Sequence, residues 1–204
     1  MARSLLIIRA GGHGRVVADV AELLGYKDIH FLDDAWPAKT STLDWPVVGR
    51  NLPDPHSDLD VFVGNGVNAE RLAEVKALLA RGFTLPSLVH PKAYVSSRAR
   101  TGVGSLVAAM AVVGVGATLG QAAIVNTGAT VDHDCVLGDG VHVSPGAHLA
   151  GTVTVGDESW IGIGAAVREG IRIGRHVMVG AGAVVVSDLA DGVKVMGNPA
   201  RVKT

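Results

Sequence analysis

A histidine followed directly by an aspartate lies beyond the middle of the chain, as His133 and Asp134. A carboxylate beside an imidazole orients the ring and favours the imidazolium that forms when the ring accepts a proton. Such a general base typically contributes about 10²- to 10⁴-fold in rate. From these two residues alone, the alternative is a surface histidine without a catalytic role.

The element that must hold this pair is indicated by a six-residue period. Between Val89 and Val185, 16 of 17 residues at this spacing are Val, Leu or Ile, and only Thr101 departs. A second column, four residues after each of these anchors, is small or aliphatic. Neither the helical period of 3.6 nor the strand period of 2 sustains a repeat of six, whereas the hexapeptide β-helix does. Three hexapeptides make one triangular coil.

The repeat also predicts which side chains face outward. His133 and Asp134 follow the anchor Val131 by two and three residues, so both face outward, as does Asn126 beside its own anchor. Cys135 falls in the inward small column, which favours a structural thiol over a nucleophile or a disulfide partner. Glycine follows the anchor at 114, 120, 138, 156, 162, 174 and 180, and we expect these glycines to form tight corner turns.

The amino-terminal part follows an α/β rhythm instead. Apolar runs predict strands, helical periodicity predicts helices, and Gly25 is suited to end the first helix. The expected strands are 4–8, 29–32 and 60–63, and the expected helices are 15–24 and 68–80. We therefore predict a Rossmann-like βαβ domain over residues 1–85, followed by a β-helix domain with a carboxy-terminal tail over residues 86–204.

A glycine-rich turn follows the first predicted strand. Gly11, Gly12 and Gly14 do not fit the dinucleotide fingerprint, but bare amides at a helix N-terminus favour phosphate. Asp33 and Asp34 end the second strand and are suited to accept hydrogen bonds from a ribose or a base. An ordinary turn and a solvated acidic loop remain the alternative for these residues.

Composition limits the classes of function. Across 204 residues the formal net charge is −1, so the chain lacks the excess of basic residues that is typical of nucleic-acid-binding proteins. Hydrophobic residues make up 48%, but glycine and polar residues interrupt every apolar run well short of a membrane span. The run 5–8 is too short for a signal peptide, so we expect a cytoplasmic protein.

Two motifs together resemble a known family. The turn Gly11-Gly12-His13-Gly14 with Phe31-Leu32-Asp33-Asp34, joined to hexapeptide coils, resembles the bacterial sugar O- and N-acyltransferases. The segment 125–135 (VNTGATVDHDC) is similar to the catalytic segment of that family, and 197–200 (GNPA) to its usual ending. Sialic acid O-acetyltransferases and UDP-4-amino-sugar N-acetyltransferases, as in the bacillosamine pathway, belong to it. The resemblance also implies left-handed winding of the β-helix.

The resemblance implies a role for each matching residue. Direct attack of a sugar amine on acetyl-CoA would use His133 as the base and Asp134 as its orienting partner. Substrate-binding positions would be Gly11, Gly12, His13, Asp33, Asp34, Gly64, Asn126 and Thr127. Positions for the donor acetyl-CoA would be His142, Gly151, Ile163 and Ala181, with the amide of Gly151 near the thioester carbonyl. No metal is expected.

The chain departs from the family pattern at Arg9, where relatives commonly have glycine. Its side chain could crowd the turn, or its guanidinium could pair with phosphate. The family also implies a homotrimer with the acyl-transfer site between subunits, and small or apolar residues on the outer faces, such as Val112 and Ile163, fit such contacts.

Three other readings remain open. Within the class, the reaction could be O-acetylation of a sugar such as sialic acid, or N-acylation of a GDP- or dTDP-linked amino sugar, although the spacing is nearest to the UDP-amino-sugar enzymes. A carbonic anhydrase on this solenoid would need three histidines at a zinc ion. His142 and His148 lie on adjacent faces, which disfavours it. A non-catalytic sugar-nucleotide-binding protein is the third.

Overall fold

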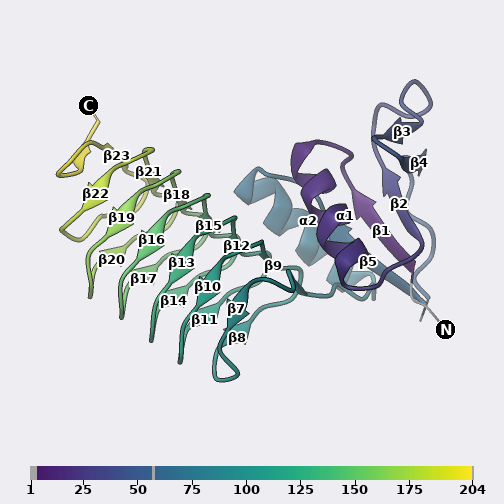
Figure 1. Cartoon of the computed structure of the whole chain (residues 1–204). Helices are drawn as coiled ribbons and strands as arrows, with labels where there is room; N and C mark the ends of the chain where they lie inside the picture. The colour runs from purple at the N-terminus through teal and green to yellow at the C-terminus, as the bar shows by residue number, and fades with distance from the viewer. Residues whose placement is uncertain (1–3, 57, 204) are drawn as a thin grey trace. The chain divides into compact units, whose positions relative to one another are not determined.

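The computed structural model of the chain describes residues 4–56 and 58–203 and contains two compact units, Met1–Leu88 and Val89–Thr204. Each unit has its own architecture (Figure 1).

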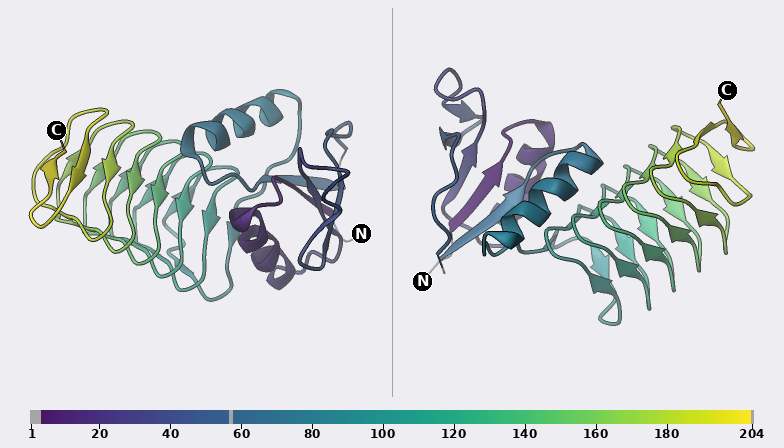
Figure 2. Two further views of the ribbon diagram at one scale, coloured as in Figure 1. Left: turned by 90° about the horizontal axis from the view of Figure 1, so that it is seen from above. Right: turned by 180° about the vertical axis from the view of Figure 1, so that it is seen from behind.

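The first unit is a five-stranded sheet with strand order β3-β4-β2-β1-β5. Its strands are β1 (Ser4–Ile8), β2 (Ile29–Leu32), β3 (Ser41–Thr42), β4 (Trp45–Gly49) and β5 (Leu59–Val63). All neighbours are parallel except β3 and β4. The helices α1 (Gly12–Leu23) and α2 (Asn68–Ala80) lie on opposite faces of the sheet (Figures 1 and 2). Because β2 and β5 flank β1 on its two sides, the strand order reverses there, which is where such folds bind ligands.

The predicted Rossmann-like α/β domain is therefore confirmed, with two differences in detail. The first helix begins at Gly12 and ends at Leu23, so the glycine turn forms its first turn. The antiparallel pair β3–β4 was not predicted, because β3 has only two residues and Pro46 interrupts the apolar run of β4. Gly25 has φ of +94°, the left-handed conformation expected after a helix end.

The second unit is a parallel β-helix arranged in three sheets, and its strands have two residues each except β23, which has three and pairs antiparallel with β24; this confirms the predicted repeat fold. The first face contains β6 (Leu88–Val89), β9 (Leu106–Val107), β12 (Ile124–Val125), β15 (His142–Val143), β18 (Trp160–Ile161), β21 (Met178–Val179), β23 (Lys194–Met196) and β24 (Arg201–Val202). The second face contains β7 (Tyr94–Val95), β10 (Val112–Val113), β13 (Thr130–Val131), β16 (His148–Leu149), β19 (Ala166–Val167) and β22 (Val184–Val185). The third face contains β8 (Arg100–Thr101), β11 (Thr118–Leu119), β14 (Val136–Leu137), β17 (Thr154–Val155) and β20 (Arg172–Ile173).

Each residue of a coil pairs with the residue 18 positions later, as Thr130 does with His148. The anchors and the small column fill the interior: from Val107 onward all of them except Ser159, which is buried but polar, belong to one hydrophobic cluster, in which Val131 and Cys135 are fully buried. Stacked coils thus bury each other's strand edges, as in other repeat proteins.

The glycines that follow the anchors serve a different purpose from the one expected. Gly114 does not have a left-handed backbone, and a Cβ there would come within 2.8 Å of the backbone of the next coil. The left-handed turn positions lie three residues after the anchor, as at Gly116 and Gly128. Our expectation of corner turns was wrong, because the close stacking of coils, and not the turn, excludes a side chain after the anchor.

Among the described residues, no helix has the length and apolar character needed to cross a bilayer.

Candidate functional site

His133 and Asp134 lie on the corner between the second and third faces, directly after β13. His133 Nδ1 is 2.9 Å from Asp134 Oδ2, and both side chains are more than half exposed. Asp134 has φ of +57°, a left-handed conformation that aspartate tolerates better than most residues. Since an ionised carboxylate only accepts hydrogen bonds, Nδ1 donates to Asp134 and Nε2 keeps its lone pair. This is the arrangement of a general base.

Gly151 lies one coil further along the same corner and faces the free nitrogen of the base. A Cβ at position 151 would overlap His133 Nε2, so only glycine leaves room for the ring. The amide of Gly151 donates to none of the described residues, whereas the next amide, of Thr152, donates to the carbonyl of His133 at 2.9 Å. A proton acceptor and an unused amide donor therefore lie side by side.

The hydrogen bond to Asp134 raises the pKa of His133 above its ordinary value, and the charges of Asp132 and Asp134 act in the same direction. The ring is therefore a stronger base than an isolated histidine. Cys135, the next residue, is buried and donates to the carbonyl of Ala150 at 3.1 Å, and burial raises the pKa of its thiol. A thiol with a raised pKa is a poor nucleophile, so the buried Cys135 is not suited to act as one.

Asn126 lies on a different corner, between the first and second faces. Its Oδ1 accepts from the amide of Thr127 at 2.8 Å, which directs Nδ2 toward His142 Nε2 at 3.1 Å. Because Nδ2 only donates, His142 accepts this hydrogen bond at Nε2. The three residues Asn126, Thr127 and His142 therefore form one hydrogen-bonded group.

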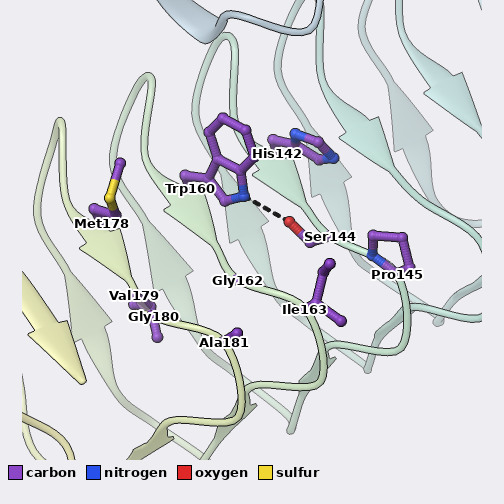
Figure 3. A pocket seen from close by; sticks show the side chains of 10 residues that line it. All are labelled: His142, Ser144, Pro145, Trp160, Gly162, Ile163, Met178, Val179, Gly180 and Ala181. Atoms are coloured by element: carbon purple, nitrogen blue, oxygen red, sulfur yellow. Dashed lines mark hydrogen bonds between the residues drawn. The ribbon is translucent and has the colours of Figure 1, made fainter. Parts of the chain in front are cut away.

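His142 also lines a groove of ≈ 340 Å³, which we call the donor groove (Figure 3). Its other lining residues are Ser144, Pro145, Trp160, Gly162, Ile163, Met178, Val179, Gly180 and Ala181. The ring of Trp160 lies 4.9 Å from that of His142, and its Nε1 donates to Ser144 Oγ at 2.6 Å. The groove is apolar along most of its length and polar near His142.

The donor groove follows the repeat. Its residues fall in columns 18 positions apart, as His142, Trp160 and Met178 do. Three of the four predicted donor-binding residues, His142, Ile163 and Ala181, line it, whereas Gly151 lies with the base on another corner. Sequence reasoning missed Trp160 and Ser144, which the same spacing, counted on from His142 and Asn126, would have found.

His133 and the donor groove are separated on one prism. His133 follows β13 on the second–third corner, and Asn126 with the groove lies on the first–second corner, so the second face lies between them. A single β-helix thus carries two half-sites.

In the first unit, the predicted nucleotide residues gather at the carboxyl ends of β1, β2 and β5. A Cβ on Gly64 would come within 2.7 Å of Gly14 Cα, so these two glycines allow the loops to touch. Gly11 has open space beside it, and Gly12 meets only the end of the Arg15 side chain at 3.9 Å. Gly11 caps α1 without a side-chain hydrogen bond, so the first amides of the helix face a space suited to an anion.

Asp33 holds this turn in place. Its Oδ2 accepts from the amide of Ala10 at 2.8 Å, its Oδ1 from the amide of Ala35 at 3.1 Å, and Lys39 Nζ lies 3.5 Å away. Burial acts to raise the pKa of Asp33, but these partners together lower it. The carboxylate predicted to bind a nucleoside is thus already engaged.

Arg9 has φ of +78°, a left-handed conformation that favours glycine, and its guanidinium is engaged by two carboxylates. It forms ion pairs with Asp34 and with Glu74 Oε1, the second at 2.9 Å. The hydrogen bond to Glu74 contributes most to raising the pKa of Arg9. A cavity of ≈ 360 Å³ beside it is also lined by Asp33, Asp34 and Arg50.

Arg71, which received no role from the sequence, is fully buried and braces the loop after β5. It donates to the carbonyls of Asn65 and Gly66 at 3.3 and 3.2 Å and to Asn68 Oδ1 at 2.9 Å. Burial, and then the charge of Arg71, lower the pKa of His13 to about 4, so this histidine is neutral at pH 7.

The described residues contain no group of three or more His, Cys, Asp or Glu side chains placed to hold a metal ion.

Each of the two units matches a known protein family. Residues 4–78 match the PglD N-terminal domain family, and residues 152–187 match the bacterial transferase hexapeptide (six repeats) family. The acetyltransferase domain of PglB from Neisseria gonorrhoeae FA1090, solved with acetyl coenzyme A, is 46% identical, with a TM-score of 0.94 and full coverage of both chains. PerB from Caulobacter crescentus, solved with CoA and GDP-perosamine, is 38% identical, with a TM-score of 0.93 over 100% of this chain and 99% of that one.

A third structure, WeeI from Acinetobacter baumannii AYE, is 25% identical, with a TM-score of 0.88 over 98% of this chain and all of that one. With identities of up to 47% over whole chains and both domains matched in order, the chain belongs to the bacterial sugar O-/N-acyltransferase family with hexapeptide repeats.

Proposed function

We propose that this protein transfers the acetyl group of acetyl-CoA to the 4-amino group of a UDP-linked amino-deoxy sugar. The observation that carries the proposal is the pair formed by His133 and Gly151: within residues 4–56 and 58–203, neither the Nε2 of the imidazole nor the amide beside it has a hydrogen-bond partner. Acyl transfer to an amine needs these two groups, one for the proton and one for the oxyanion.

In the reaction, the amine attacks the thioester carbonyl, and the carbon–nitrogen bond forms as His133 Nε2 takes the proton of the amine. The amide of Gly151 stabilises the oxyanion of the tetrahedral intermediate. The intermediate collapses by breaking the carbon–sulfur bond, and the imidazolium gives its proton to the leaving thiolate. Asp134 holds the ring and stabilises its charged form.

The apolar donor groove suits the pantetheine arm of acetyl-CoA, with Ile163 and Ala181 along the arm and His142 toward the thioester. Relatives support this donor, since the PglB domain was solved with acetyl coenzyme A and PerB with CoA. Asn126 and Thr127, which are linked to His142, would hold the sugar beside the base of a neighbouring copy.

The first unit would bind the nucleotide. The amides of Gly11, Gly12 and His13 at the start of α1 suit the diphosphate, and Asp33, Asp34 and Gly64 surround the same edge of the sheet. We favour UDP because the motifs resemble the UDP-amino-sugar enzymes. A GDP-linked amino sugar is the second candidate, because PerB was solved with GDP-perosamine.

The separation of the two half-sites favours a homotrimer in which His133 of one copy meets the donor groove of the next. Mixed trimers test this directly. His133→Ala and Ala181→Trp should each abolish activity alone, the second by filling the groove. Equal random mixing should restore about a quarter of the sites, because one copy then supplies the base and its neighbour the groove. No recovery in co-assembled trimers would contradict the shared site.

The reaction itself is tested by release of free thiol from acetyl-CoA against UDP-, GDP- and dTDP-linked 4-amino sugars and sialic acid. Turnover of one UDP-amino sugar that is lost in His133→Ala is the expected result. Turnover of sialic acid alone would contradict N-acetylation. Full activity in His133→Ala would show that another residue is the base.

A further inference from the structure

The second face of the β-helix has no role in the proposed function, although it lies between the two half-sites. Its outward-facing column contains one residue per coil, directly before each anchor: Tyr94, Val112, Thr130, His148, Ala166 and Val184. This column contains no Lys, Arg, Asp or Glu, whereas the matching column of the third face contains Arg100 and Arg172. Tyr94 is 62% exposed and Val112 36%. An uncharged face with exposed apolar side chains is typical of a surface that another chain covers.

The corners that carry the half-sites determine how this face is covered. His133 lies at one edge of the second face and the donor groove at the other. In the homotrimer of the proposed function, on which this inference rests, the first edge of each copy meets the second edge of its neighbour. Three triangular prisms joined at these edges in a closed ring turn their second faces toward the threefold axis. With the opposite corner turned inward, the prisms would diverge outward and the two edges would not meet.

Threefold symmetry then brings the same residue of each copy to the same height on the axis. His148 lies in the middle part of the column, paired with Thr130 in the preceding coil and with Ala166 in the following one. Sheets that pack face to face lie about 10 Å apart, so three faces at this spacing lie about 5 Å from the axis. An exposed imidazole spans that distance, and the short side chain of Ala166 leaves space beside it. Three histidines would thus meet at one point of the axis.

A hydrogen bond holds each of these imidazoles in a fixed orientation. His148 Nδ1 is 3.0 Å from Thr130 Oγ1, and Nε2 has no partner among residues 4–56 and 58–203. In the neutral tautomer whose Nδ1–H donates to the hydroxyl, Nε2 keeps its lone pair. Metal-binding histidines almost always donate their other ring N–H to an oxygen acceptor in this way. The contact with Thr130 therefore prepares Nε2 to act as a ligand.

Three imidazole nitrogens suit a divalent ion of the first transition series, zinc among them, with the fourth position open to water. We propose that the three His148 side chains of a trimer bind one such ion on the threefold axis. Within residues 4–56 and 58–203, one chain brings no three His, Cys, Asp or Glu side chains together to hold a metal, so the ion is shared by three copies. Because it binds the trimer and not the free chain, it stabilises the assembly.

The metal content of the trimer tests the site without requiring turnover. The protein, free of any affinity tag and stripped of metal with a chelator, is titrated with zinc, and bound zinc is measured by mass spectrometry after gel filtration. The wild type should bind one zinc for every three chains, and the trimer should unfold at a higher temperature with zinc than without it. His148→Ala should lose both effects. His176→Ala removes an exposed histidine from another corner and should keep both.

Thr130→Val distinguishes a ligand site from a chance contact between histidines. Valine keeps the shape of threonine but cannot accept from Nδ1, so zinc should bind about 10- to 100-fold more weakly at the same stoichiometry. One zinc per chain, or zinc binding that survives in His148→Ala, would overturn the axial site.

Other outcomes separate this inference from the proposed function. A trimer that acetylates its sugar but binds no zinc would refute the axial site and leave the proposed function standing. A monomeric protein would refute both the axial site and the active site shared between copies. Zinc binding of the expected stoichiometry in a protein without transferase activity would support the axial site and refute the proposed reaction.

Discussion

Gly151 and His133 lie against each other on one corner of the β-helix, although 18 residues separate them in the chain. The space that a Cβ at position 151 would need is filled by the imidazole, and the carbonyl of His133 accepts from the amide of Thr152 at 2.9 Å. The stacking of one coil on the next thus fixes both the position of the base and the amide beside it.

Gly151→Ala should therefore reduce turnover strongly while leaving the fold intact. The glycine does not have a left-handed backbone, so alanine fits the turn, but its methyl group must displace the ring. Moving a catalytic group by about 1 Å costs on the order of 10²-fold in rate. We expect kcat to fall by about that factor, with unchanged thermal unfolding. Ala150→Gly, which alters the same turn without adding an atom, is the control, and an active Gly151→Ala enzyme would show that the ring does not need this position.

The pKa of His133 predicts the acidic limb of the pH–rate profile. A general base must be neutral, and the hydrogen bond to Asp134 raises the pKa of the ring, so kcat/KM should fall as the pH drops through a value above the ordinary one for histidine. Asp134→Asn removes the charge but tolerates the left-handed backbone at this position. In that variant the limb should move to lower pH and maximal turnover should fall, as measured by initial rates from pH 5 to 9. An unmoved limb would mean that another group titrates.

The repeat and its outward faces could be predicted because a six-residue period leaves little freedom. Once Val131 is an anchor, the positions of His133 and Cys135 follow. The same logic failed for the glycines after the anchors, because the single-coil pattern does not show the backbone of the next coil, which excludes a Cβ at Gly114. Trp160 was missed for another reason: the 18-residue spacing that places it one coil beyond His142 was not counted on from that histidine.

The first unit was predicted less completely, since its contacts join loops that are distant in sequence. Asp33 was expected to bind a ligand, but the structure engages it with the amide of Ala10, 23 residues earlier. Arg9 pairs with Glu74 on α2, a partner that no local pattern indicates.

Asp33→Ala should affect one substrate only. Without the carboxylate, the amide of Ala10 loses its acceptor and the glycine turn loosens, which weakens the proposed phosphate site. We expect the KM for the nucleotide sugar to rise about tenfold and the KM for acetyl-CoA to stay the same, because one hydrogen bond to a charged group is worth about 1.5 kcal/mol or more. The KM of Asp33→Asn for the nucleotide sugar should lie between those of the wild type and Asp33→Ala, because asparagine keeps one acceptor oxygen. An equal rise in both KM values would indicate a general loss of structure instead.

His13 predicts a pH-dependent loss of stability in the first unit. Its folded pKa of about 4 lies below the ordinary histidine value of 6.5, so the folded protein stays neutral at this position while the unfolded chain takes up a proton. The contribution of His13 to the free energy of unfolding is therefore fully present above pH 6.5. As the pH falls toward 4, up to about 3 kcal/mol of it is lost. His13→Gln cannot titrate, so its free energy of unfolding should change less over this range.

Urea unfolding followed by tryptophan fluorescence in a Trp160→Phe background reports on the first unit, where Trp36 and Trp45 lie. If the free energy of unfolding depends on pH equally in the two proteins, His13 is protonated in the folded state. Our description of it as a buried neutral histidine beside Arg71 would then be wrong.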